Sequence, residues 1–123
     1  VQGVPADLRH QRAGQVLDEV GLSGLAGRLP AEMSGGQQQR VAVARAIANH
    51  PALVLADEPT ANLDSRSAAH LMALFVTLNS ERGITFVIST HDTRVMAYAR
   101  RLISMRDGMI VGDELQEPQS MAV

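Results

Sequence analysis

The stretch that decides the fold is Met33-Ser-Gly-Gly-Gln-Gln-Gln-Arg40, followed by Leu53-Val-Leu-Ala-Asp-Glu-Pro59. Ser34, with Gln37 three residues later, predicts a capping box that opens a helix running to about Asn49. Glycines at a helix start allow close backbone approach, and the first turn presents unpaired N–H groups. The first segment therefore has the features of an anion site. A flexible loop with an ordinary capping box is the plain alternative.

The second segment reads as a buried strand that ends in two adjacent carboxylates, Asp57 and Glu58. Residues 52–56 are continuously apolar, which is the pattern of a parallel strand covered on both faces. Ligands of open α/β sheets bind outside the carboxyl ends of the strands. A carboxylate there suits a hard cation such as Mg²⁺, and the neighbouring acid, pointing the other way, can act on a water molecule. A solvated acidic turn is the alternative.

A second apolar strand, expected over residues 84–89, leads directly to His91. On its own, a histidine at a strand end is more often a surface or capping residue. Asp64 predicts the N-cap of a helix that connects the two strands and runs to about Ser80. A strand–helix–strand unit of this length forms a right-handed parallel crossover, so we predict an α/β fold.

Outside this unit we expect a lead-in helix, a short helix and a terminal hairpin. Pro5 and apolar residues at helical spacing predict the first helix, which Gly21 ends. The turn Arg106-Asp107-Gly108 predicts the hairpin, with strands at 102–105 and 109–111. Because His50-Pro51 breaks the second helix, the expected segments are a helical part (1–49), an α/β core (50–113) and a polar tail (114–123).

Composition excludes several classes of protein. The chain has 123 residues, is 46% hydrophobic and carries a net charge of −2, which fits one globular domain. It lacks the basic cluster of a nucleic-acid-binding protein, and no apolar run approaches the roughly 18 residues of a membrane span. It has no cysteine and no lysine. A phosphate-binding loop of the form G-x-x-x-x-G-K-[ST] is therefore absent from it.

In this order and at this spacing, the motifs resemble those of the ATP-binding cassette (ABC) ATPases. Residues 33–40 resemble the signature motif, 53–58 the Walker B strand, 61–64 the D-loop and His91 the switch histidine. The resemblance covers about 110 residues and implies a fragment of a P-loop NTPase-like α/β fold with a parallel sheet core. Residues 55–64 are most similar to the bacterial lipoprotein-releasing and macrolide-export ATPases.

The resemblance implies a role for each matched residue. Asp57 would hold Mg²⁺ directly or through water, Glu58 would be the general base, and His91 would contact the γ-phosphate of ATP and sense hydrolysis. The D-loop, Asn62-Leu63-Asp64, would couple two nucleotide sites across a dimer, a role compatible with an N-cap. The γ-phosphate of an ATP held by the opposite nucleotide-binding domain would be contacted by Ser34, Gly35, Gly36 and Gln37.

The family further implies an ATPase that drives a membrane permease from the cytoplasmic face of the membrane. No Walker A loop, A-loop aromatic or Q-loop is recognisable, so we expect a missing N-terminal half that carries Walker A. The chain alone should neither bind ATP tightly nor hydrolyse it, and its sheet should keep an apolar edge that this half covers.

Two other functions are weighed against transport. The ABC-type head of a DNA-repair or chromosome protein is disfavoured by the helix breaks at Gly21 and Pro30 and by the lack of a basic stripe, so we expect no nucleic-acid partner. A catalytically silent dimerisation module would need neither Glu58 nor His91.

Overall fold

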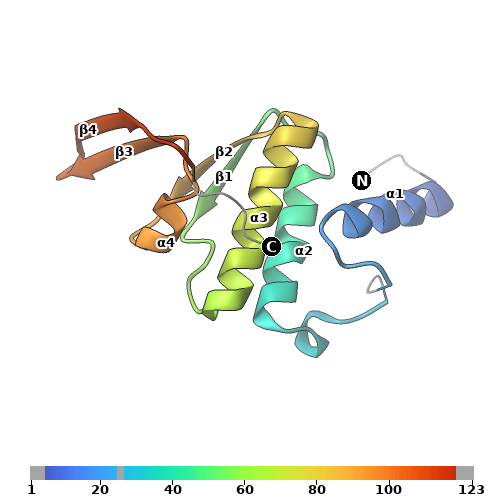
Figure 1. The fold of residues 1–123 in the computed structure, drawn as a ribbon. Coiled ribbons are helices and arrows are strands. Elements are labelled where there is room, and N and C mark those ends of the chain that lie inside the picture. The colour runs from blue at the N-terminus through green and yellow to red at the C-terminus, as the bar shows by residue number, and fades with distance from the viewer. Residues whose placement is uncertain (1–4, 25–26, 119–123) are drawn as a thin grey trace.

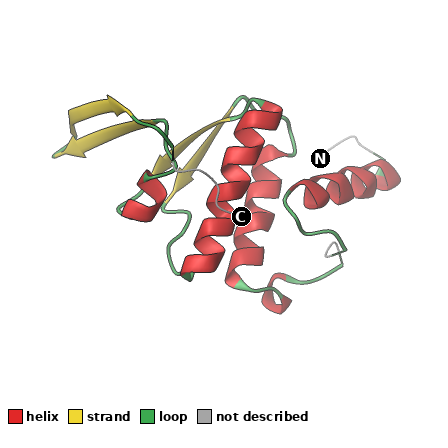
Figure 2. Cartoon of the chain, viewed as in Figure 1, coloured by secondary structure: helices red, strands yellow, loops and turns green. Residues whose placement is uncertain are grey.

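The structure is a computed structural model that describes residues 5–24 and 27–118. It confirms the predicted α/β class, with a parallel sheet, helices before it and a C-terminal hairpin (Figure 2). In chain order the elements are α1 (Ala6–Glu19), a 3₁₀ turn (Pro30–Glu32), α2 (Gly35–Ile47), β1 (Leu53–Asp57), α3 (Ser65–Arg82), β2 (Thr85–Ser89), α4 (Thr93–Met96), β3 (Arg101–Arg106) and β4 (Met109–Leu115).

The sheet that carries the predicted site consists of β1 and β2, which are parallel and are connected through α3. Asp57 pairs with Ser89 at the end of the ladder. The two strands therefore end side by side, and the residues that follow them, Glu58 and Thr90, leave the same edge of the sheet. This is the place where ligands bind in open α/β sheets.

One hydrophobic core joins the helices to the sheet. Helices α2 and α3 lie side by side and cover one face of β1 and β2 (Figure 1). On that face, Phe75 of α3 stacks on Phe86 of β2 with ring centroids 4.7 Å apart. The core includes residues from both sides of the predicted boundary at residues 49 and 50, so these segments share one core. Its buried members are Val20, Leu22, Val43, Ala44, Ile47, Val54, Leu71, Met72, Phe75, Leu78, Ile84 and Val95.

The helix ends follow local sequence signals. The side chain of Asp64 accepts a hydrogen bond from the Ser67 N–H and caps α3. Gly83 ends α3 at φ 68°, and Gly21 follows α1 at φ 78°. Left-handed backbone is unfavourable for residues with a Cβ, so glycine suits both positions. Among the described helices, none combines the length and the apolar character needed to cross a membrane.

The prediction that β1 is covered on both faces is wrong for this chain. Val54 is buried under the helices, but Leu53, Leu55 and Val87 on the opposite face are 51%, 73% and 52% exposed. Side chains alternate between the faces of a strand, and α2 and α3 cover only one of them. The described residues supply nothing to cover the other face.

The terminal hairpin is longer than expected. β4 continues to Leu115 and is not limited to residues 109–111, so the predicted polar tail does not begin at Glu114. The Gln116 side chain also donates to the carbonyls of Met96 and Ala99 and so binds the end of the hairpin to the α4 region. Helix α4 ends at Met96. Residues 119–123 of the predicted tail lie outside the described residues.

Candidate active site

Glu58 lies in a tight turn directly after β1. Its backbone is left-handed, at φ 46°, which is uncommon for a residue other than glycine. The Glu58 N–H donates to the carbonyl of Ser89 on the neighbouring strand at 2.8 Å, and the Glu58 carbonyl accepts from the Ala61 N–H at 3.1 Å. The turn is thereby held from both sides. Backbone strain of this kind persists only where the surrounding structure enforces it, and it concentrates at functional sites.

The side chains of Glu58 and His91 meet across the carboxyl edge of the sheet. Glu58 Oε1 and His91 Nδ1 are 2.7 Å apart, although the residues are 33 positions apart in sequence. The Glu58 side chain is about one-third exposed, and that of His91 is fully exposed. An ionised carboxylate can only accept a hydrogen bond, so Nδ1 carries the proton in this contact. The exposed ring then presents Nε2 to whatever approaches from solvent.

Asp57 lies one residue earlier, on the uncovered side of the sheet. Its Oδ1 accepts a 2.5 Å hydrogen bond from the hydroxyl of Ser89, its partner in the strand register. Within the described part of the chain, no three histidine, aspartate or glutamate side chains gather as a metal site. One carboxylate with a neighbouring hydroxyl is an oxygen-only donor set. It fits a hard cation that keeps several of its own waters, as Mg²⁺ does.

The predicted capping box is present at the start of α2. Ser34 Oγ accepts from the Gln37 N–H at 3.1 Å, and Gln37 Oε1 accepts from the Ser34 N–H at 3.0 Å. Close packing also explains why a glycine follows in this turn. A Cβ on Gly36 would lie 3.2 Å from the hydroxyl oxygen of Ser67, so a side chain there would press on the start of α3. The turn at Ser34 is therefore both a helix start and a close packing contact.

The predicted D-loop, Asn62-Leu63-Asp64, lies between the Glu58 turn and the start of α3. Asn62 has a left-handed backbone, at φ 66°. Asp64 caps α3, and the hydrogen bond from the Ser67 N–H, followed by that from the Ser67 side chain, lowers the pKa of its carboxyl. A Cβ on Gly35 would lie 3.5 Å from Leu63, so the Ser34 turn packs directly on this segment.

The structure thus brings the predicted residues together in two groups. Glu58, His91 and Asp57 lie at the carboxyl edge of the sheet, and the Ser34 turn lies with the D-loop at the starts of α2 and α3. In the parts of the chain that the structure describes, no hydrogen bond or ion pair joins the Ser34 turn to Glu58 or His91.

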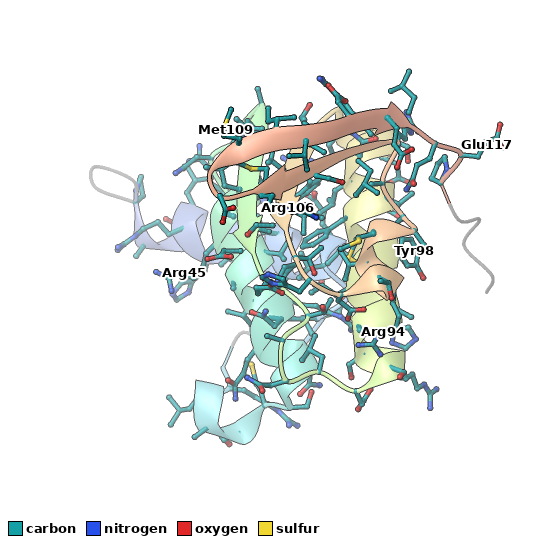
Figure 3. The ribbon with its side chains drawn as sticks, turned by 90° about the vertical axis from the view of Figure 1, so that its left-hand side faces the viewer. Arg45, Arg94, Tyr98, Arg106, Met109 and Glu117 are labelled. Carbon is teal, nitrogen blue, oxygen red and sulfur yellow. The ribbon has the colours of Figure 1, made fainter. Side chains whose placement is uncertain are left out.

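A polar network next to His91 was not predicted from the sequence. Thr60, which is 3% exposed, makes a long 3.5 Å contact to Asp92. The side-chain hydrogen bonds from Arg94, followed by its backbone N–H, lower the pKa of Asp92 to about 2. Arg94 also donates to the hydroxyl of Ser65 at 2.9 Å, and Figure 3 shows it beside the N-terminal end of α3. The network holds the loop after His91 against α3. An aspartate before a short helix is an N-cap signal that points to Asp92.

Comparison with known proteins gives consistent matches. A family model described as ABC transporter matches residues 6–61. The macrolide export ATP-binding/permease protein MacB 1/2 of Paracoccus denitrificans is 49% identical over 112 residues, which are 91% of this chain and 17% of that protein. The pyoverdine export ATP-binding/permease protein PvdT of Pseudomonas savastanoi pv. phaseolicola is 47% identical over 121 residues, covering 96% of this chain and 18% of that protein.

Solved structures agree with these sequence matches. The dimeric structure of MJ0796, a bacterial ABC transporter cassette, superposes with a TM-score of 0.78 at 40% identity, covering 94% of this chain and 50% of that chain. A post-hydrolysis state of the same cassette, bound to ADP and Pi, matches at 41% identity. The chain thus spans less than a fifth of the two export proteins and half of the solved cassette. At this identity over more than nine-tenths of its length, the chain belongs to the ABC transporter family, where it matches the ATP-binding cassette.

Proposed function

We propose that this chain is the C-terminal half of an ABC cassette that hydrolyses ATP to drive transport through a membrane permease. The observation that carries the proposal is the 2.7 Å contact between Glu58 and His91 at the ends of two adjacent parallel strands. A surface pair of this kind contributes little to stability. Two titratable side chains lie together at a ligand-binding edge, next to a strained turn. A catalytic role explains this arrangement better than a contribution to stability does.

In this proposal Glu58 is the general base. Its carboxylate accepts a proton from the water that attacks the γ-phosphorus of ATP, while the bond to the bridging oxygen breaks and ADP leaves. His91 meets a γ-phosphate oxygen through Nε2. Nε2 is the ring nitrogen that does not face Glu58, so it is the one open to a γ-phosphate oxygen.

We assign Mg²⁺ to Asp57, directly or through water. The residues present fit it, since the Asp57 carboxylate and the Ser89 hydroxyl offer only oxygen. When bound, the ion would neutralise phosphate charge during the reaction. What the chain itself does is hold the Asp57 carboxylate at the edge of the sheet through the Ser89 hydrogen bond.

The Ser34 turn is assigned to a second cassette's nucleotide. The hydroxyl of Ser34, the glycine backbone and the unpaired N–H groups of the first turn of α2 suit an anionic phosphate. Because no hydrogen bond or ion pair among the described residues joins this turn to Glu58 or His91, we infer a dimer in which the turn from one cassette faces the catalytic edge of the other. The D-loop packs on the turn and would connect the two sites. A dimeric solved relative supports this arrangement.

We also propose that a segment bearing a Walker A loop completes the cassette. The chain spans half of the solved cassette it matches. It contains no lysine, so the phosphate grip of a Walker A lysine must come from elsewhere. The uncovered side chains of Leu53, Leu55 and Val87 give such a segment an apolar face to pack on. Without it, the chain should be inactive.

The export relatives support the transport assignment. Both are described as ATP-binding/permease proteins, so we propose a permease partner and a position at the cytoplasmic face of the membrane. The permease would select the substrate.

The test is Glu58→Gln in the full-length polypeptide that carries this chain. Loss of a general base typically reduces the rate 10²–10⁴-fold, and the isosteric amide should leave ATP binding intact. ATP affinity by equilibrium binding and phosphate release under saturating ATP separate the two effects. Glu81→Gln, an exposed acid on α3, is the matched control and should keep full turnover. Normal turnover of Glu58→Gln would remove Glu58 from the mechanism.

A further inference from the structure

Helix α2 makes a polar contact with the turn that carries Glu58. Gln39, which is half-buried on α2, donates a hydrogen bond from Nε2 to the carbonyl of Pro59, the residue directly after Glu58. The two residues are 20 positions apart in sequence. Pro59 is buried, and its carbonyl would lose a partner without this amide.

The contact falls where the backbone needs support. Glu58 has φ 46°, a conformation that the Cβ of an L-residue disfavours. Its N–H is held by the Ser89 carbonyl and its C=O by the Ala61 N–H. Both of these bonds lie on the sheet and loop side. Gln39 hydrogen-bonds the Pro59 carbonyl from the helix side, so the turn is held from two directions.

Beside this contact, the packing of α2 against the end of β1 leaves an open pocket. A pocket of about 160 Å³ lies between the two elements, and the small side chains of Ala42 and Ala46 contribute to its lining. Van der Waals contact is therefore incomplete along this part of α2. The hydrogen bond from Gln39, which also lines the pocket, is a directional contact from the helix to the end of the strand.

We propose that Gln39 is a positioning residue for Glu58. Its amide fixes the Pro59 peptide, holds the Glu58 turn in its left-handed form and so keeps the carboxylate aimed at His91 and at the attacking water. Helix α2 also begins at the Ser34 turn, so the Gln39 contact connects that turn, through the helix, to the turn that carries Glu58. This inference rests on the proposed role of Glu58 as base.

The experiment uses the full-length polypeptide and two substitutions that remove the donor. Gln39→Met keeps length without a polar group, and Gln39→Glu keeps shape but replaces the NH₂ with an oxygen. Misplacement of a catalytic group can lower the rate by up to about 10²-fold. We expect kcat to fall at least about tenfold in both variants, with the dissociation constant of ATP changed less than about twofold. Gln15→Met, an exposed glutamine on α1, is the control and should leave kcat unchanged.

A double variant separates positioning from a general structural role. In the Glu58→Gln background the base is already absent, so Gln39→Met should cause no further loss of the residual rate. A structural defect would lower that residual rate and weaken ATP binding as well, and either result would overturn the inference. If Glu58→Gln itself turns over normally, the proposed function fails. If Glu58→Gln is inactive but both Gln39 variants keep full kcat, only the role of Gln39 fails.

Discussion

The left-handed backbone of Glu58 predicts an unusual response to truncation. At φ 46° the Cβ of any L-residue is strained, and glycine is not. We compare Glu58→Ala with Glu58→Gly. Both substitutions remove the carboxylate and the contact with His91, so those losses cancel in the comparison. Only the Cβ and the freedom of the unfolded chain differ between the two variants.

The magnitude follows from two opposing terms. Left-handed backbone costs a residue with a Cβ about 1–2 kcal/mol, and glycine adds about 0.4–1 kcal/mol of unfolded-state entropy. At the midpoints of these two ranges, the glycine variant is more stable than the alanine variant by about 0.8 kcal/mol. For a chain of 123 residues this corresponds to a melting temperature roughly 2–5 °C higher.

The assay is urea unfolding followed by circular dichroism, supported by thermal melts. Ala69→Gly, on the exposed face of α3, is the control and should have the opposite sign, because glycine costs about 1 kcal/mol in a helix interior. An alanine variant at residue 58 as stable as the glycine variant would refute the strained turn, and with it the reason for the Gln39 contact. In the full-length polypeptide, turnover should be lost in both variants, because both lack the Glu58 carboxylate.

Three further predictions follow from the same structure. Ile47→Ala should lower the free energy of unfolding by about 2–5 kcal/mol, because Ile47 is 0% exposed in the core; a urea titration measures this, and a loss below 1 kcal/mol would contradict the packing. Ser34→Ala should cost about 1 kcal/mol of stability through the lost cap and Ser34→Gly only a few tenths, so equal melting temperatures of the two variants would argue against the capping box. Asp92→Asn should destabilise the fold above about pH 4, and the difference from the parent chain should vanish as the pH falls through about 2. Arg94 lowers the pKa of Asp92 from 3.8 to about 2. A carboxyl with a lowered pKa stabilises the fold only while it is ionised. Melts from pH 2 to pH 6 test the sign, and a difference that grows toward acid would be inconsistent with it.

Local signals in the sequence predicted most element boundaries. The capping box at Ser34, the N-cap at Asp64 and the end of α1 at Gly21 depend on residues within a few positions of each other. Such interactions form in the same way whatever the rest of the chain does. The apolar runs before Asp57 and before His91 likewise predicted two parallel strands. β1 is shifted by one residue at both ends from the expected 52–56, and β2 begins one residue later than expected.

Predictions that needed knowledge of distant neighbours were less successful. A continuous apolar run is compatible with burial on both faces, but the exposure of Leu55 depends on which helices exist to cover it. The length of β4 depends on pairing with β3, because register in a hairpin is set by the partner strand as well as by the local sequence. Neither the cover of a face nor the extent of a ladder is encoded within a short window.

The sequence by itself determined the α/β order of elements, the family and the identity of the candidate residues, because motif spacing and helix capping are short-range properties. The tertiary structure alone placed Glu58 against His91 and joined Gln39 to the turn that carries Glu58. These contacts link residues about 20 or more positions apart. Such distances are decided by how helices pack on the sheet, and no local pattern of residues specifies that packing.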